Sequence, residues 1–173
     1  MKPQDIIILI KIHIWNQGRW KIIPLAETTF ISKTEVQKGI QRLKQSGLFD
    51  QALERPKKFA MQEFLIHGLK YCFPAELGTA TRGVPTSHAA PALEDKIVSS
   101  DKEIYVWPYA KGKKRGTSLK PLYKTAPEAA LEDPRMYHYL ALIDAIRIGK
   151  AREQAIAKEE LIKLIKLGNE YEV

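Results

Sequence analysis

The sequence has a single cysteine, Cys72, and no long hydrophobic run. A lone cysteine excludes a disulfide framework or a cysteine-rich zinc site within one chain, and it suits a reducing compartment. A helix needs about 18 consecutive apolar residues to span a bilayer. The densest apolar stretch, 6–15, is interrupted by Lys11 and His13, and it lacks the small-residue cleavage site of a secretory signal. We therefore expect a cytoplasmic protein with no membrane partner.

Motifs for catalysis and metal binding are also missing. No nucleophile-elbow sequence surrounds the Ser87-His88 pair, as a hydrolase of that type requires. The spacing of His67, Cys72 and His88 matches no established set of metal ligands. Cys72 is instead predicted on the buried face of a helix. We expect no enzymatic activity, no cofactor and no metal site.

Negative charge is scarce in the first third of the chain. The whole sequence holds 28 Lys+Arg and 20 Asp+Glu, a net charge of +8. Residues 1–58 hold 11 basic and 5 acidic residues, a net charge of +6, whereas residues 59–173 hold 17 and 15, a net charge of +2. A basic module attracts a polyanion, because neutralising phosphates releases condensed counterions. A solubilising surface explains the charge equally well, so charge alone leaves both interpretations open.

The first 58 residues predict three helices followed by two strands. Pro3 suits a helix start, and the apolar residues after it predict a buried helix that ends at 16–18. Residues 20–23 are predicted to be extended, and Pro24 is predicted to open a short helix to about Thr29.

The third helix has the clearest local signal. Ser32 and Glu35 form an S-x-x-E capping box, and Gly47 suits a helix end, so the pattern predicts a helix over 33–46. Gly39 inside this helix is expected to allow close approach of the second helix. Apolar residues at i, i+4 and i+7 predict one buried stripe: Val36, Ile40 and Leu43.

The opposite side of this helix is predicted to contact DNA. It carries hydroxyl, amide and cationic side chains and no carboxylate: Thr34, Gln37, Lys38, Gln41, Arg42 and Gln45. Gln pairs with adenine edges, Arg with guanine, and Lys suits phosphate. In the following loop, Arg55, Lys57 and Lys58 are expected to follow phosphates. The alternative is an amphipathic helix whose outer face is merely solvated, but the order of the elements favours DNA binding.

Two resemblances support this interpretation. The stretch ISKTEVQKGIQRLKQSGLF, within the first 58 residues, resembles winged-helix regulators of the broad MarR-like kind. More of the chain is similar to a family of small bacterial helix-turn-helix proteins of unsettled function, through FLIHGLKYCFPAELGTATRGVPTSHAAP, VWPYAKGKKRGTSLKPLY and APEAALEDPRMYHYLALIDAIRIGKARE. The resemblance implies a regulator that is encoded beside a partner it controls, and it supplies no catalytic residues.

Residues 59–173 are predicted to form a mixed, mainly helical region. The patterns indicate a helix over 59–73, an irregular segment over 75–101, a strand over 103–107 with a partner over 116–123, and helices over 127–131, 134–148 and 151–167. The segment 79–87, with its hydroxyls and Arg82, is interpreted either as an anion or partner site or as a loop held by its own hydrogen bonds.

A second acid-free basic run follows, and it is expected at a hairpin tip between strands: Lys111, Lys113, Lys114, Arg115, Lys120 and Lys124. A second nucleic-acid contact and a solvated turn remain equally open for it. The sequence 112–116 is not a phosphate-binding P-loop, because the Gly-Lys-Ser/Thr ending is absent.

Together these patterns predict an α+β protein with a winged-helix domain over 1–58 and a dimerisation or partner-binding region over 59–173. The predicted function is sequence-specific binding of double-stranded DNA for transcriptional control, as a homodimer. The terminal helices are candidates either for the dimer contact or for the chain's own core: Leu140, Ile143, Ile146, Leu161, Ile162 and Ile165. The alternative is a protein-interaction module, such as the regulatory or neutralising partner of a neighbouring toxin, docking through 75–101.

Overall fold

The computed structural model describes residues 1–15, 20–97 and 103–167, which form a mixed α+β structure. Three helices come first: α1 (Pro3–Trp15), α2 (Ile22–Thr29) and α3 (Lys33–Gln45). A short antiparallel ribbon of β1 (Phe49–Asp50) and β2 (Arg55–Pro56) follows. The predicted α+β class and the predicted order of three helices and two strands are confirmed.

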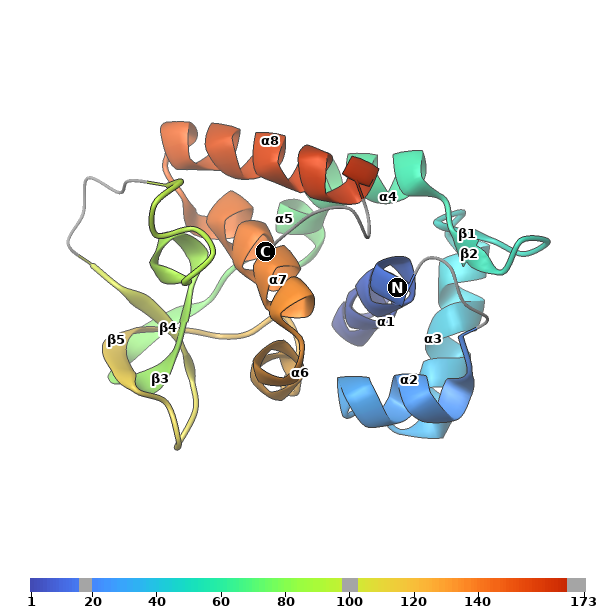
Figure 1. The fold of residues 1–173 in the computed structure, drawn as a ribbon, viewed down its shortest axis with the longest axis horizontal. Helices are drawn as coiled ribbons and strands as arrows, with labels where there is room; N and C mark the ends of the chain where they lie inside the picture. The colour runs from blue at the N-terminus through green and yellow to red at the C-terminus, as the bar shows by residue number, and fades with distance from the viewer. Residues whose placement is uncertain (16–19, 98–102, 168–173) are drawn as a thin grey trace.

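Helix α1 lies at the centre of the molecule and is buried on all sides (Figure 1). Its residues 6–10 are fully buried, and even the polar Gln4 and Lys11 are less than a tenth exposed. It packs against α2 and α3 on one side and against α7 (Pro134–Ile148) on the other. This position explains why its apolar residues run around the whole helix rather than along one stripe.

The prediction of an extended segment over 20–23 is wrong, because α2 already begins at Ile22. Pro24 is the third residue of this helix, where its missing N–H has no partner within the helix to lose. The helix ends at Thr29, and the N–H of Phe30 bonds back to the carbonyls of Ala26 and Glu27. The left-handed backbone of Phe30 (φ 55°) turns the N–H of Ile31 toward the carbonyl of Ala26 at 3.1 Å. Residues 16–18, which were expected to end the first helix, lie outside the described residues.

The predicted helix over 59–73 is confirmed as one rod with a π-helical turn in the middle. It consists of α4 (Lys58–Glu63), the π-turn η1 (Phe64–Gly68) and α5 (Leu69–Cys72). Cys72 is exposed, so its prediction as a buried thiol is wrong. The helix ends at Cys72, and Phe73 leaves the helical backbone because Pro74 restricts the conformation of its predecessor.

A small closed barrel of three strands follows, and its first strand lies within the segment 75–101 that was predicted to be irregular. The other two strands lie close to those predicted over 103–107 and 116–123. Strand β3 (Leu77–Thr86) pairs antiparallel with both β4 (Tyr105–Pro108) and β5 (Lys114–Leu119). A 3₁₀ turn, η2 (Ser87–Ala89), follows β3; residues 98–101 lie outside the described part. Strands β4 and β5 pair parallel, so the prediction of a hairpin between them is also wrong.

The C-terminal helices agree with their predictions: α6 (Ala126–Glu132), α7 and α8 (Ala151–Leu167). Asp133 caps α7 by accepting the backbone N–H groups of Arg135 and Met136. The six apolar residues considered for a dimer contact pack inside the chain, five of them buried and Ile162 partly so. They belong to the chain's own core, which is continuous with α1. The domain boundary at 58 stays a prediction.

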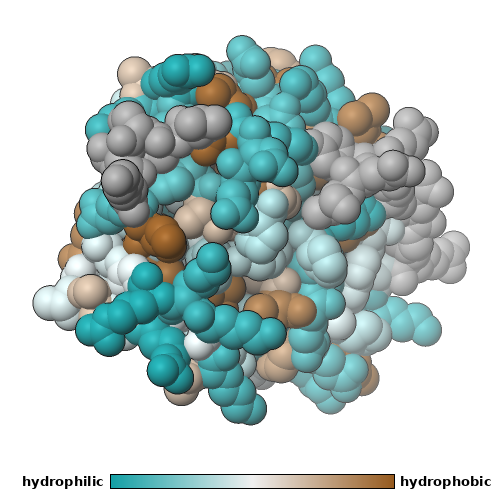
Figure 2. Space-filling model, turned by 60° about the vertical axis from the view of Figure 1, so that its left-hand side comes forward, coloured by the Kyte–Doolittle hydropathy of each residue, from teal (hydrophilic) through white to brown (hydrophobic). Residues whose placement is uncertain are grey.

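A buried carboxylate ties the barrel to α7. Asp144 accepts hydrogen bonds from Thr86 Oγ1 of β3 at 2.8 Å and from Trp107 Nε1 of β4 at 2.7 Å. Arg147 Nη1 pairs with its other oxygen at 2.7 Å. Figure 2 brings the barrel side of the molecule forward, and hydrophilic side chains gather over its lower part. Within the described ranges, none of the helices combines the length and hydropathy needed to cross a membrane.

Candidate nucleic-acid interface

Helix α3 forms where its caps and apolar stripe predict it. Ser32 Oγ accepts the N–H of Glu35 at 3.4 Å, and Gly47 takes a left-handed backbone (φ 77°) beyond the last turn. Val36, Ile40 and Leu43 are buried against the other helices, as predicted. The predicted helix and its buried side are therefore confirmed.

The outward side of α3 carries polar and cationic side chains. We call its five exposed residues the α3 face: Thr34, Gln37, Lys38, Gln41 and Gln45. Their spacing of three to four residues places them along one side of the helix. Lys33, which the sequence argument passed over, is exposed at the start of the same helix and adds a cation.

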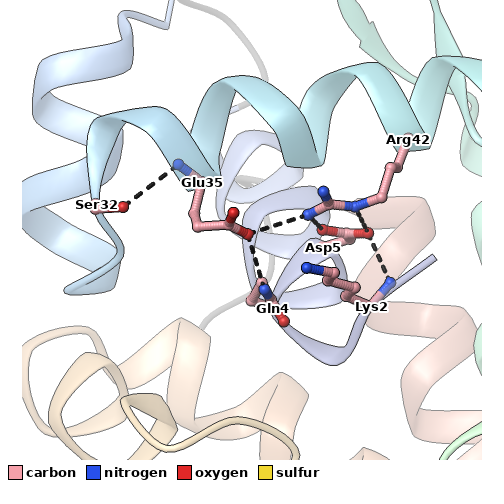
Figure 3. Close-up of polar contacts among 6 residues, drawn as sticks. All are labelled: Lys2, Gln4, Asp5, Ser32, Glu35 and Arg42. Atoms are coloured by element: carbon pink, nitrogen blue, oxygen red, sulfur yellow. Dashed lines mark hydrogen bonds and ion pairs between the residues drawn. The ribbon is translucent and has the colours of Figure 1, made fainter.

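Arg42 does not join the α3 face. Its guanidinium binds the buried carboxylate of Asp5 on α1 with two hydrogen bonds, Nε to Oδ2 at 2.8 Å and Nη2 to Oδ1 at 2.6 Å (Figure 3). Its side chain is 20% exposed, and the hydrogen bonds to Asp5 raise the pKa of Arg42. The prediction that Arg42 lies on the outer surface is wrong, because Asp5 needs a partner charge once it is buried.

Glu35 serves the same cluster rather than a complete capping box. Its carboxylate accepts a hydrogen bond from Gln4 Nε2 at 3.0 Å and lies 3.4 Å from Arg42 Nη2 (Figure 3). The bond from Gln4 contributes most to lowering the pKa of Glu35. The acid is thus turned toward α1, which leaves the α3 face without a carboxylate of its own helix.

Gly39 lets α3 lie close to α1, not to α2 as predicted. A Cβ atom at Gly39 would come within 2.6 Å of Ile8 Cδ1 and 3.0 Å of Asp5 Oδ1. The same contact places Asp5 under Arg42, so the glycine and the ion pair fix one orientation of α3 on α1.

The β1–β2 ribbon carries the other predicted cations. Arg55, Lys57 and Lys58 are exposed, and with Asp50 and Pro56 they line a hollow of about 390 Å³, the ribbon hollow. The Asp50 carboxylate accepts the N–H groups of Leu53 and Ala52, and the bond from Leu53 contributes most to lowering its pKa. Its negative charge was missed from sequence, and it partly offsets the cations around it.

The ribbon is fixed to the body near the end of α3. Trp20 Nε1 donates to the carbonyl of Glu54 at 2.6 Å, and the Trp20 ring meets Phe49 edge to face. The N–H of Lys57 donates to the carbonyl of Leu48 at 2.9 Å. The ribbon hollow therefore keeps a defined position relative to α3.

Comparison of the chain with models of protein families, with curated proteins and with solved structures found no match. A function for this surface has to be argued from its own geometry and charge.

Proposed function

We propose that the protein binds double-stranded DNA with α3 in the major groove and the β1–β2 ribbon on the adjacent backbone, as a winged helix-turn-helix. The observation that carries this proposal is the α3 face, five exposed polar and cationic residues on one side of a helix whose acid is turned inward. The major groove is about 12 Å wide and admits a helix. The MarR-like resemblance of this stretch agrees with the assignment.

The side chains divide into two roles in this proposal. Gln37 and Gln41 read adenine edges, since an amide both donates and accepts in the plane of the base. Lys38, Lys57 and Lys58 contact phosphates, which position the protein without reading sequence. Arg42 contributes indirectly, because its pair with Asp5 sets the angle at which α3 leaves the body.

In this proposal the protein acts as a homodimer, because the helix that contacts the bases is short. Helix α3 has 13 residues and reaches few base pairs, and a two-fold partner doubles the site. Transcriptional control is the function that sequence-specific binding of this kind serves.

The test compares variants on specific and scrambled duplexes over a range of salt concentrations, starting with duplexes from the region upstream of the gene. Gln37→Ala or Gln41→Ala should weaken specific binding by about 1–3 kcal/mol and flatten discrimination between duplexes. Lys57→Gln should weaken specific and nonspecific binding alike and reduce the salt slope by about 1.

Arg152→Gln is the matched control, since Arg152 is exposed near the start of α8, the end of that helix farther from α3 and the ribbon (Figure 1). It removes the same charge and should leave binding unchanged. If every α3-face variant binds DNA as the wild type does while remaining folded, α3 does not contact the bases. The protein-interaction alternative then takes first place, although its docking segment 75–101 now includes a barrel strand.

A further inference from the structure

A second cationic surface lies on the barrel, at the end of the molecule opposite α3 (Figure 1). A hollow of about 420 Å³ is lined by four cations and a glycine: Arg82, Gly112, Lys113, Lys114 and Arg115. We call it the barrel hollow. Among the described residues, no carboxylate and no apolar side chain lines it.

The carboxylates of neighbouring strand ends are engaged elsewhere. Glu76 pairs with Lys120, with Nζ–O distances of 2.8 and 2.9 Å, and Glu103 accepts a hydrogen bond from Thr117 Oγ1. In the part of the chain that the structure describes, none of the four cations of the barrel hollow forms an ion pair. Their charge is available to a ligand.

The strand register places like charges against each other. Arg82 of β3 and Arg115 of β5 are direct cross-strand partners, and Lys114 is opposite Gly83. Directly opposed side chains lie about 5 Å apart at Cβ, and like charges there are unfavourable. An anion between the two guanidinium groups relieves this repulsion and accepts hydrogen bonds from both.

Two glycines allow close backbone contacts in the barrel, Gly112 between the basic loop and β3 and Gly83 between β3 and β4. A Cβ atom at Gly112 would come within 2.5 Å of the backbone of Gly83, and one at Gly83 within 1.9 Å of the Trp107 carbonyl oxygen. The loop before β5 therefore lies directly on β3, which brings Lys113 and Lys114 to Arg82. Backbone packing therefore fixes where the residues that line the barrel hollow leave the chain.

The lining favours a phosphate over a protein partner. Stable protein interfaces have an apolar, often aromatic centre, which the described lining of this hollow lacks. Phosphate recognition needs cations and polar donors, and Arg supplies a fork that matches phosphate oxygens. A row of phosphates along a nucleic-acid backbone satisfies four cations at once.

We infer that the barrel hollow is a phosphate-binding site that holds a nucleic-acid backbone, independently of α3. With α3 at the opposite end, one protomer then contacts two separate backbone segments. The inference does not depend on the assignment of α3, because different residues at a different end carry it.

The test measures binding of a scrambled duplex of about 20 base pairs between about 50 and 200 mM salt. It is made with the wild type and with a variant whose α3 face and ribbon are disabled by Gln37→Ala, Gln41→Ala, Lys57→Gln and Lys58→Gln. Adding Arg82→Gln and Arg115→Gln should reduce the salt slope by about 2 in both backgrounds. The matched control, Lys124→Gln with Arg152→Gln, removes the same charge from exposed sites outside the hollow and should leave the slope unchanged.

Equal effects of the barrel pair and its control would overturn the inference, since they would report net charge alone. Lys113→Gln with Lys114→Gln repeats the test if the arginine pair fails to fold. Amide NMR shifts identify the ligand, with pyrophosphate, the duplex and polyglutamate as probes. Shifts at 112–115 with both pyrophosphate and the duplex support the site. Shifts with pyrophosphate alone, or equal shifts with polyglutamate, overturn the nucleic-acid assignment.

Discussion

The α3 end and the barrel end each contain one buried aspartate that joins neighbouring helices or strands. At the α3 end, Asp5 pairs with Arg42 and so joins α1 to α3. At the barrel end, Asp144 joins β3, β4 and α7. In both places the aspartate orients elements that carry a cationic surface. A buried carboxylate accepts hydrogen bonds only in specific directions, so it fixes orientation where apolar contacts alone tolerate sliding.

The two clusters differ in how completely water is excluded. Arg42 keeps 20% of its side chain exposed, so water replaces part of a lost bond. Arg147 and Asp144 are only 4% and 2% exposed, and Trp107 Nε1 is bonded inside the core. An unpaired group costs more where water cannot reach it. The barrel should therefore be the less tolerant of the two ends.

Replacing Asp144 should have the largest effect. Asp144→Ala leaves Arg147, Trp107 and Thr86 without their shared acceptor, and breaking a buried ion pair in this way costs about 3–5 kcal/mol. Asp144→Asn keeps one acceptor oxygen and should cost less. Urea unfolding followed by tryptophan fluorescence measures both.

The exposed Asp95 provides the control, since Asp95→Ala should change stability by less than about 0.5 kcal/mol. A similarly small loss for Asp144→Ala would mean that the barrel is held to α7 without this cluster.

Acid should weaken the core of the molecule through two buried histidines. Burial contributes most to lowering the pKa of His13 on α1 and of His138 on α7, each to about 4. Because both folded pKa values lie below the unfolded value of about 6.5, the neutral forms are stabilised by folding. The contribution of each histidine to the free energy of unfolding is fully present above pH 6.5. It is lost as the pH drops toward 4, by up to about 3 kcal/mol for each histidine.

Burial also raises the pKa of Asp144, which acts in the opposite direction, so the histidines have to be isolated. His13→Gln and His138→Gln should each flatten the dependence of unfolding free energy on pH between 6.5 and 4. Substitution of the exposed His67 should leave that slope as it is. If the slope of unfolding free energy against pH is unchanged in both variants, the histidines do not cause the loss of stability in acid.

Breaking the Asp5–Arg42 pair should have a smaller effect than breaking the Asp144 cluster. Asp5→Asn, Arg42→Gln and the double variant form a cycle, for which we expect a coupling energy of about 1–3 kcal/mol. The cycle also separates two roles of Arg42. A loss of folding stability supports the tie to α1, whereas unchanged stability with lost discrimination between duplexes would restore Arg42 as a base reader.

Sequence patterns within a few residues of each other predicted the helices well. They did not predict the ion pairs and hydrogen bonds that join elements far apart in the chain. Caps, proline positions and apolar spacing gave α3 and the terminal helices, because those signals lie within a few residues of each other. Strand β3 was not predicted from the sequence. Most of its residues are exposed and it contains glycine and proline, so it shows no alternating apolar pattern. Its partners lie more than 15 residues away in sequence.

The candidate site shows the same division. Exposure of Gln37, Lys38 and Gln41 follows from the apolar stripe on the other side of the helix. The partial burial of Arg42 does not follow from the helix pattern, because it depends on Asp5, 37 residues earlier in the chain. In the sequence, an aspartate in the first turn of an apolar helix was the available hint that a cation elsewhere has to meet it.

The smallest expected effect concerns the glycine at the α1–α3 contact. Gly39→Ala gains about 1 kcal/mol of helix propensity, but the new methyl group lies 2.6 Å from Ile8 Cδ1 and 3.0 Å from Asp5 Oδ1. Ile8 is fully buried, so it has little room to move, and overpacking of this kind costs about 1–3 kcal/mol. We expect Gly39→Ala to be neutral or destabilising.

Ile8→Val removes the obstructing carbon and by itself should cost about 0.5–1.5 kcal/mol. In the Gly39→Ala background the same change should cost less or become favourable, because the valine leaves room for the new methyl group. Urea unfolding of the two single variants and the double variant gives the coupling energy. Strict additivity would show that α3 can move away from α1 without loss. In that case Asp5 and Arg42, rather than the close contact at Gly39, set the position of α3, and the two ends of the molecule depend on their buried aspartates alike.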